Sequence, residues 1–123
     1  MHSHKELALW QNAISLVTDI YMMTKQFPKE EIYGLTSQIR RSALSVPSNI
    51  SEGAARNQSK EFIRFLYISM GSISELETQL IIDRNLKYIS DFKFQDQENK
   101  IRKIRIQLAG LIKSIKNHPK KTS

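Results

Sequence analysis

The sequence contains no cysteine and very little glycine or proline, with four glycines and three prolines in 123 residues. The absence of cysteine excludes disulfides, thiolate metal sites and cysteine nucleophiles, and it fits the reducing cytoplasm, where we expect this protein to reside. The scarcity of glycine and proline argues against both disorder and a turn-rich β architecture. No apolar run approaches the ~20 residues that a membrane-spanning helix needs, so we expect no membrane partner.

Histidine is also scarce, and its three occurrences, His2, His4 and His118, lie near the ends of the chain. A di-iron bundle needs Glu-x-x-His pairs within its helices, and a serine nucleophile needs a histidine beside it. A glycine-rich phosphate loop is absent as well. The sequence therefore predicts no metal site, no cofactor and no catalytic residue, and we expect the protein not to be an enzyme.

The charge is strongly one-sided. Lysine and arginine number 19 against 12 acidic residues, which gives a formal net charge of +7 and a pI of about 9.8. Such a balance favours polyanionic partners, of which nucleic acid and an acidic protein are the two that we consider. Solubility alone is the other explanation.

Apolar residues recur at helical spacing in four segments. This periodicity predicts helices at about residues 5–27, 36–56, 59–87 and 92–117, followed by a basic tail at 118–123. We expect Thr36 and Ser59 to cap the second and third helices. Because the connections are short, neighbouring helices are expected to be antiparallel, so the fold class is all-α: an up-down four-helix bundle in a single domain, residues 1–123.

The first expected helix has two adjacent apolar stripes rather than one. They consist of Leu7, Trp10, Ile14, Val17 and Tyr21, and of Leu9, Ala13, Leu16, Ile20, Met23 and Phe27. A face of this width indicates that the helix meets more than one neighbour.

Pro47 lies inside the second expected helix. Proline removes one backbone hydrogen bond there and clashes with the preceding turn. Asn49 and Glu52 have the spacing of a capping box, so the helix could stop and restart. We favour a continuous helix with a kink at Pro47, because the apolar face continues in phase across it.

The second helix also carries a polar stripe among small residues. Its members are Gln38, Arg41, Ser45, Asn49, Glu52 and Arg56, with Arg40 beside them. One interpretation is a groove that binds phosphate or RNA. The other is a close helix–helix or subunit contact with internal polar partners, and the sequence supports the two equally. Of the carboxylates, we expect Glu52, Glu75 and Glu77 to contact Arg or Ser rather than to form an acid–base pair.

Two basic clusters stand out. Arg56, Lys60 and Arg64 span the second connection, although the break at Asn57 leaves their common face uncertain. The last helix and tail carry Lys100, Arg102, Lys103, Arg105, Lys113, Lys116, Lys120 and Lys121 with no acidic residue between them. These side chains could neutralise phosphates or simply form a solvated face. Aromatics between basic residues would favour a single-stranded ligand, but we expect Phe92 and Phe94 to lie in the core.

Several runs of sequence resemble a known family. The run from Ile32 to Gly53, which includes Pro-Ser-Asn-Ile-Ser-Glu-Gly, resembles the bacterial 23S ribosomal RNA intervening-sequence proteins, as do the runs 65–72 and 74–80 and the pair Trp10-Gln11. The resemblance extends over roughly Leu7 to Ile115. It implies a four-helix bundle that assembles as a homopentameric ring, without an established enzyme activity. The accessory variability determinant of diversity-generating retroelements is similar in fold, and it associates with reverse transcriptase and nucleic acid.

Two functional hypotheses follow. In the first, a basic homo-oligomer binds RNA or DNA through residues of the second, third and fourth helices: Arg40, Arg41, Arg56, Lys60, Arg64, Lys100 and Lys103. In the second, the protein is an interaction scaffold, or an accessory subunit of a nucleic-acid enzyme such as a reverse transcriptase, and it receives an acidic protein partner. In both, Gln38, Asn49, Glu52 and Glu75 are polar residues of a groove or of the structure.

Overall fold

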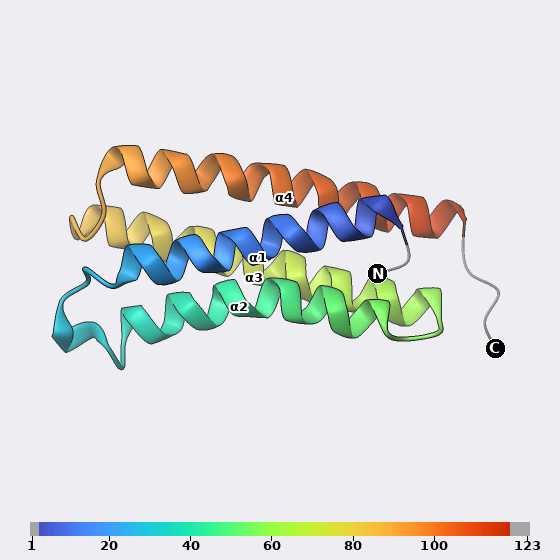
Figure 1. The fold of residues 1–123 in the computed structure, drawn as a ribbon, viewed down its shortest axis with the longest axis horizontal. Coiled ribbons are helices and arrows are strands. Elements are labelled where there is room, and N and C mark those ends of the chain that lie inside the picture. The colour runs from blue at the N-terminus through green and yellow to red at the C-terminus, as the bar shows by residue number, and fades with distance from the viewer. Residues whose placement is uncertain (1–2, 119–123) are drawn as a thin grey trace.

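The computed structural model describes residues 3–118 and contains four long helices, with no strand in that part of the chain (Figure 1). They are α1 (His4–Thr24), α2 (Leu35–Ala54), α3 (Ser59–Asn85) and α4 (Asp91–Asn117), with a short 3₁₀ helix, η1 (Lys29–Glu31), between α1 and α2. The four-helix bundle that the sequence predicts is confirmed. His2 and the expected tail beyond His118 lie outside the described residues.

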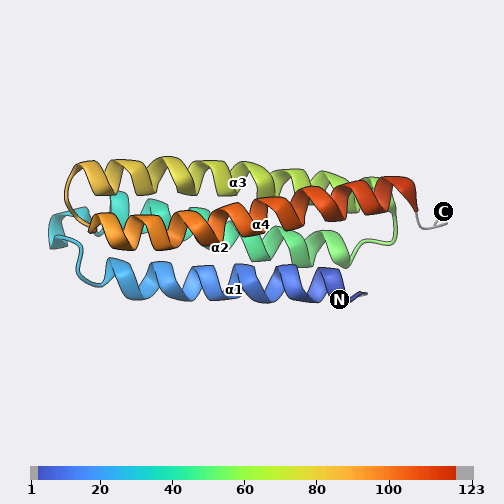
Figure 2. The ribbon, with the colours of Figure 1, turned by 90° about the horizontal axis from the view of Figure 1, so that it is seen from above.

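The helices are arranged in a square in which each contacts two others. α2 packs most extensively against α3, α1 lies against α2 and α4, and α4 completes the square against α3. Figures 1 and 2 show consecutive helices running in opposite directions along the bundle. As a result, the N-terminus of α1, the α2–α3 turn and the C-terminus of α4 all lie at one end.

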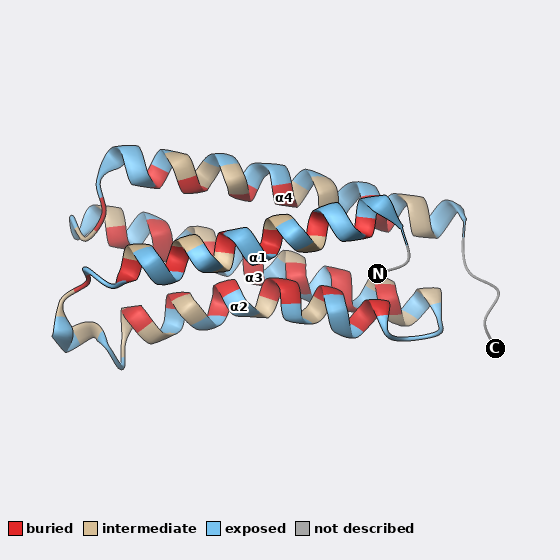
Figure 3. Cartoon of the chain, viewed as in Figure 1, coloured by how far each residue is buried: buried red, intermediate tan, exposed pale blue. Residues whose placement is uncertain are grey.

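The core follows the inner face of every helix (Figure 3). Its fully buried large side chains come from all four helices: Leu9, Leu16, Ile20, Ile39, Ile50, Leu66, Ile73, Leu76, Leu80, Ile101, Ile104 and Leu108. Phe94 is buried as expected, but the expectation for Phe92 is wrong, since its side chain is 78% exposed. Phe92 follows the first residue of α4, on the side of the helix opposite the core.

Two of the expected caps are wrong. The N-cap of α2 is Gly34 rather than Thr36, and the N-cap of α3 is Gln58 rather than Ser59. α1 ends at Thr24, three residues before the expected Phe27. The Thr24 hydroxyl lies 2.7 Å from the Ile20 carbonyl and 3.2 Å from the Tyr21 carbonyl, and the latter is one of the four that the helix end leaves without a backbone partner.

Pro47 is buried within α2, which runs without interruption from Leu35 to Ala54. The helix therefore does not restart at Asn49, and the kink at Pro47 stays a prediction. Beside the proline, the buried Ser69 hydroxyl of α3 donates to the Val46 carbonyl at 2.9 Å. This bond fixes α3 against α2 at the middle of their contact.

None of the helices in residues 3–118 combines the length and the apolar character needed to cross a bilayer.

Candidate nucleic-acid interface

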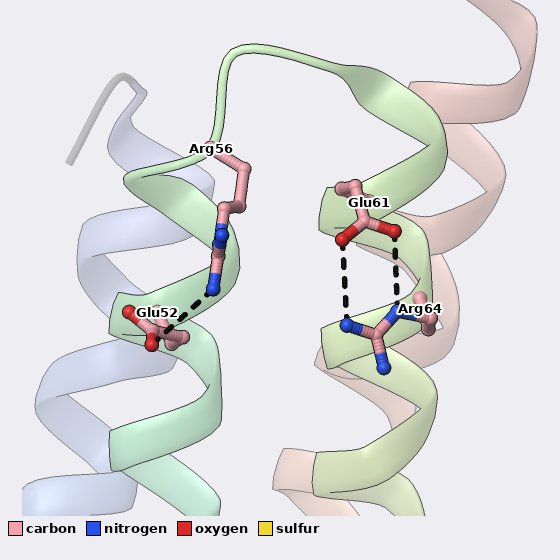
Figure 4. A network of polar contacts seen from close by, with 4 residues as sticks. All are labelled: Glu52, Arg56, Glu61 and Arg64. Atoms are coloured by element: carbon pink, nitrogen blue, oxygen red, sulfur yellow. Dashed lines mark hydrogen bonds and ion pairs between the residues drawn. The ribbon is translucent and has the colours of Figure 1, made fainter.

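The α2–α3 turn brings Arg56 and Arg64 to the same aromatic ring, with Lys60 in the first turn of α3. Arg64 donates from Nε and from a terminal nitrogen to the two oxygens of Glu61, at 3.1 and 3.3 Å (Figure 4). The hydrogen bonds from Arg64 lower the pKa of Glu61, and the charges of Arg64, Arg56 and Lys60 lower it further. The fields of all three cations therefore converge at Glu61, even though the chain is not helical between Ala54 and Ser59.

Phe65 links two of these cations. The guanidinium of Arg64 lies 4.6 Å from the centre of the Phe65 ring, and that of Arg56 lies 5.1 Å from it. Such contacts between a cation and an aromatic face hold the guanidinium in place without consuming its hydrogen-bond donors. The side chains of Arg56 and Arg64 remain 46% and 57% exposed, so they are accessible to a ligand.

Acidic residues reduce the charge of this cluster. Arg56 pairs with Glu52 at 3.4 Å, and Arg64 pairs with Glu61 (Figure 4). Both are exposed pairs between residues three or four positions apart, and such pairs contribute little to stability. A phosphate, which binds arginine with two parallel hydrogen bonds, can compete for the same guanidinium donors.

The basic residues of α4 form a separate group. Lys100 pairs with Asp19 of α1 and, at 3.8 Å, with Asp96 of its own helix, and the hydrogen bond to Asp19 raises the pKa of Lys100. Lys103 is exposed and makes no ion pair within residues 3–118. A helix rises 1.5 Å per residue, so these lysines lie roughly 20 Å along α4 from the end that holds the α2–α3 turn. The structure thus does not bring all the expected basic residues into one site.

Two members of the polar stripe of α2, Ser45 and Asn49, lie at the contact with α3, whereas the other members are exposed. The Ser42 hydroxyl donates to Glu75 at 2.9 Å, the hydroxyls of Ser45 and Ser72 lie 2.8 Å apart, and the Asn49 amide donates to Ser45. These contacts form a helix–helix contact with internal polar partners, and the groove that binds phosphate or RNA stays a prediction for the exposed part of the stripe. Gln38, Arg41 and Glu52 are exposed at its edge.

Arg40 contacts α1. Its Nε donates to the Thr24 hydroxyl at 2.8 Å, its terminal nitrogen donates to the Tyr21 carbonyl at 3.3 Å, and its guanidinium lies 4.6 Å from the centre of the Tyr21 ring. These contacts use several of its donors inside the molecule and satisfy a carbonyl at the end of α1. Arg40 is therefore less available to a ligand than the exposed Arg41.

An apolar groove runs along the outside of α1 and α2. Its volume is about 640 Å³, and Trp10, Ile14, Leu44 and Pro47 are among the residues that line it. Leu7 and Ile14 of the first apolar stripe of α1 are exposed, whereas Leu9, Ala13, Leu16 and Ile20 of the second are fully buried. The bundle thus uses one stripe for its own core and leaves most of the other on the surface.

Sequence reasoning missed a buried acid. Asp83 is 0% exposed, and neither of its carboxylate oxygens has a hydrogen-bond partner in the described part of the chain; the same is true of the Gln79 amide oxygen, one helical turn away. Burial, with a smaller contribution from the negative charge of Glu31, raises the pKa of Asp83 to about 7. The one available signal was that Gln79 and Asp83 occur at heptad spacing beside Leu76 and Leu80.

A second missed feature is a pair of carboxyl groups between α3 and α4. Burial and a hydrogen bond to Glu77 raise the pKa of Glu98 to about 7, while that hydrogen bond and Arg105 lower the pKa of Glu77. Arg105 also pairs with Glu77 at 3.0 Å. Glu77 thus contacts an arginine, as expected. No group of three or more His, Cys, Asp or Glu residues in the described chain could hold a metal ion.

Comparisons with known proteins identify the family. Residues 5–110 match the family described as 23S rRNA-intervening sequence protein. The fold is similar to the crystal structure of a protein of unknown function from the S23 ribosomal protein family of Bacteroides thetaiotaomicron VPI-5482, with a TM-score of 0.82 and 24% identity, over 89% of this chain and 98% of that one. No curated protein matches the sequence. The family match covers most of the chain, and the chain therefore belongs to the 23S rRNA-intervening sequence protein family.

Proposed function

We propose that this protein is a non-enzymatic, basic homo-oligomer of the cytoplasm that binds RNA or DNA through the end of the bundle at the α2–α3 turn. The observation that carries the proposal is that the Arg56 and Arg64 guanidinium groups lie over the same Phe65 ring and stay accessible, with Lys60 in the first turn of α3. Arginine and lysine grouped on one surface are the usual electrostatic basis of phosphate binding. Arg41 and Lys103, which are exposed, are secondary contacts in this proposal.

The test is a salt titration with a matched control. We expect fluorescently labelled RNA and duplex DNA to bind at low salt and the affinity to fall steeply as salt rises. Replacing Arg56, Lys60 and Arg64 by glutamine should reduce the salt slope by about 2 to 3 on duplex, since each phosphate contact contributes ~0.9. The control replaces the exposed Lys25, Lys29 and Lys93 at the opposite end, with the same change in net charge. Equal affinities of the two variants, or no binding by the wild type, would refute the proposal.

The apolar groove supports the oligomeric part of the proposal. Exposed Ile14 and Leu44 line it, and apolar surface of this kind is typical of contacts between subunits. We propose a homopentamer, whose mass by light scattering is five times the 14.3 kDa of one chain. Replacing Ile14 and Leu44 by lysine should lower that mass. An unchanged mass in the variant, or a monomeric wild type, would contradict this part.

The same groove favours a second function. It could receive another protein, which would make the chain an interaction scaffold or an accessory subunit of a nucleic-acid enzyme such as a reverse transcriptase, with the basic surface facing an acidic partner. A pull-down from cell extract, with and without nuclease, separates the two functions. Partners that persist after nuclease treatment support the scaffold, and the loss of every partner supports the nucleic-acid function.

A further inference from the structure

A tyrosine near the same end of the bundle is exposed beside a lysine of another helix. The side chain of Tyr67 on α3 is 51% exposed, although it lies between the buried Leu66 and the core residue Ser69. Lys116 of α4 donates to the Tyr67 hydroxyl at 3.1 Å, and its ammonium lies 5.4 Å from the centre of the Tyr67 ring. The last turns of α4 are thereby placed against the first half of α3.

Tyr67 and Lys116 form part of a pocket of about 310 Å³ between α3 and α4. Its lining consists of Tyr67, Met70, Ala109, Ile112, Lys113, Lys116 and Asn117. The pocket thus combines one aromatic ring, apolar side chains, one amide and two cations, and no carboxylate. Its volume lies at the lower end of the ~300–1,000 Å³ that is usual for sites of small organic groups.

A second pocket, near the start of α4, has carboxylates as well as lysines in its lining. It has a volume of about 420 Å³, and its lysines lie opposite carboxylates, since Asp19 and Asp96 line it together with Lys93 and Lys100. Lys100 already pairs with both aspartates. In the lining of the Tyr67 pocket, by contrast, no acid neutralises the two cations.

The Tyr67 pocket lies beside the side of α3 that carries Lys60 and Arg64 of the basic cluster. Arg64 precedes Tyr67 by three residues and Lys60 by seven, which places all three on neighbouring positions of one side of α3. A negatively charged chain that crosses α3 from the turn toward α4 would meet Arg56, Lys60 and Arg64 first and then Lys116 and Lys113. An exposed aromatic ring lies on that path.

We propose that the Tyr67 pocket binds a base of a single-stranded polynucleotide, with the base stacked on the Tyr67 ring. Every nucleobase has an apolar face that stacks on an aromatic ring, whereas bases within a duplex are already stacked on each other. The base takes the place of the Lys116 ammonium over the ring, and this long side chain turns to the adjoining phosphate together with Lys113. Asn117 offers a donor and an acceptor to the edge of the base. The inference rests on the proposed function, and it specifies the form of nucleic acid.

The experiment compares two replacements of Tyr67 on two ligands. Labelled oligo(dT) and oligo(rU) represent single strands, and a blunt DNA hairpin represents duplex. We expect Tyr67→Leu to weaken binding of both single strands about five- to a hundredfold, as the loss of one stacked base does, and to leave hairpin binding within twofold. Tyr67→Phe keeps the ring and should retain the affinity for single strands. Phe92→Leu, which removes a more exposed aromatic at the other end of α4, should change neither.

The outcomes separate this inference from the proposed function. Equal weakening on single strand and hairpin, or no weakening in Tyr67→Leu, would overturn the base-stacking site while the proposed function stands. Failure of the wild type to bind any of the three ligands would overturn both. Circular dichroism and the mass by light scattering are measured on each variant. If Tyr67→Leu loses the assembled mass but keeps its affinity for single strands, the pocket is a subunit contact. That outcome also overturns the inference.

Discussion

The hydroxyl oxygens of Ser45 and Ser72 lie 2.8 Å apart across the contact between α2 and α3. Each serine has a further partner, because Ser72 donates to the Ile68 carbonyl at 3.2 Å and Ser45 accepts from the Asn49 amide at 2.9 Å. Small side chains therefore let the two helices approach closely while their polar atoms stay paired. A set of bonds of this kind fixes the position of one helix along the other.

This relationship predicts coupling between the two serines. Ser45→Ala and Ser72→Ala should each lower the free energy of unfolding by about 1 kcal/mol, since each removes a hydrogen bond at a partly buried contact. The double variant should lose less than the sum, because the bond is lost only once. Urea unfolding of the two singles, the double and the wild type gives the coupling, and Ser74→Ala at an exposed position of α3 is the control. Additive losses would show that the two hydroxyls do not interact.

The surroundings of Gly53 and Gly71 predict opposite effects of a glycine-to-alanine change on the free energy of unfolding. A Cβ at Gly53 would lie 2.7 Å from the Phe65 Cβ and 2.9 Å from the Phe62 Cδ1, whereas a Cβ at Gly71 has nothing within 4 Å. Gly53→Ala should lower the free energy of unfolding by about 1–3 kcal/mol through overpacking. Gly71→Ala, on an open face of α3, should instead raise it by up to ~1 kcal/mol through helix propensity. A stable Gly53→Ala protein would mean that α3 can move away from α2 without cost.

Asp83 predicts a stability that falls as the pH rises. Its pKa is about 7 in the folded protein against 3.8 ordinarily, so between these values the folded state holds a proton that the unfolded state has released. The free energy of unfolding should decrease across this window, by at most about 1.4 kcal/mol per pH unit, and level off above it. The protonated carboxyl also offers a donor where the Gln79 oxygen and both Asp83 oxygens have none.

Asp83→Asn should remove the share of this dependence that comes from Asp83. The amide is neutral at every pH, so the variant should gain stability over the wild type at pH 8 and little or none at pH 4. Thermal unfolding across that range measures the effect, and Asp83→Ala, which also removes the charge but leaves a cavity, should flatten the same slope at a lower overall stability. A slope as steep in both variants as in the wild type would contradict the prediction for Asp83.

The Glu77–Glu98 pair predicts a related effect between α3 and α4. The pKa of Glu98 is about 7 against 4.5 ordinarily, so its contribution to the free energy of unfolding also becomes less favourable as the pH rises between those values. Glu98→Gln retains a donor for Glu77 that needs no proton, and it should be more stable than the wild type above pH 7. Glu98→Leu retains the size without the donor and should not reproduce the full gain. Equal stability of Glu98→Gln and the wild type above pH 7 would contradict a proton held between Glu77 and Glu98 in the folded protein.

The helices could be predicted from the sequence because apolar spacing is a local property. The seams through Leu66, Ile73 and Leu80 and through Ile101, Ile104 and Leu108 are buried as the heptad pattern indicates. The cap of α2 at Gly34 could not be read in this way, because Thr36 has the right chemistry for a cap and the chain still enters the helix earlier. Phe92 was expected in the core and is exposed, because an aromatic residue at the start of a helix does not reveal which side of the helix it occupies.

The candidate interface was only partly predictable. Charge and spacing indicated Arg56, Lys60 and Arg64, but their common location depends on how the α2–α3 turn folds back, which no local pattern encodes. The same holds for Tyr67, which follows the seam residue Leu66. Its contact with Lys116, 49 residues later in the sequence, depends on how α4 packs against α3. Asp83 and Glu98 escaped notice because their altered pKa values arise from burial, a property of the assembled bundle.

Both ends of the described chain lie beside the α2–α3 turn (Figure 1), and this has a practical consequence for anyone who labels the protein. A tag or fusion at either terminus would extend from the end of the bundle that also holds the α2–α3 turn, so an acidic linker would compete with phosphate for Arg56 and Arg64. The connection around Lys29–Glu31 lies a helix length away, roughly 40 Å for the 27 residues of α3. A reporter inserted there would leave the basic end uncovered, and binding constants measured with terminal fusions are best compared with those from the untagged chain.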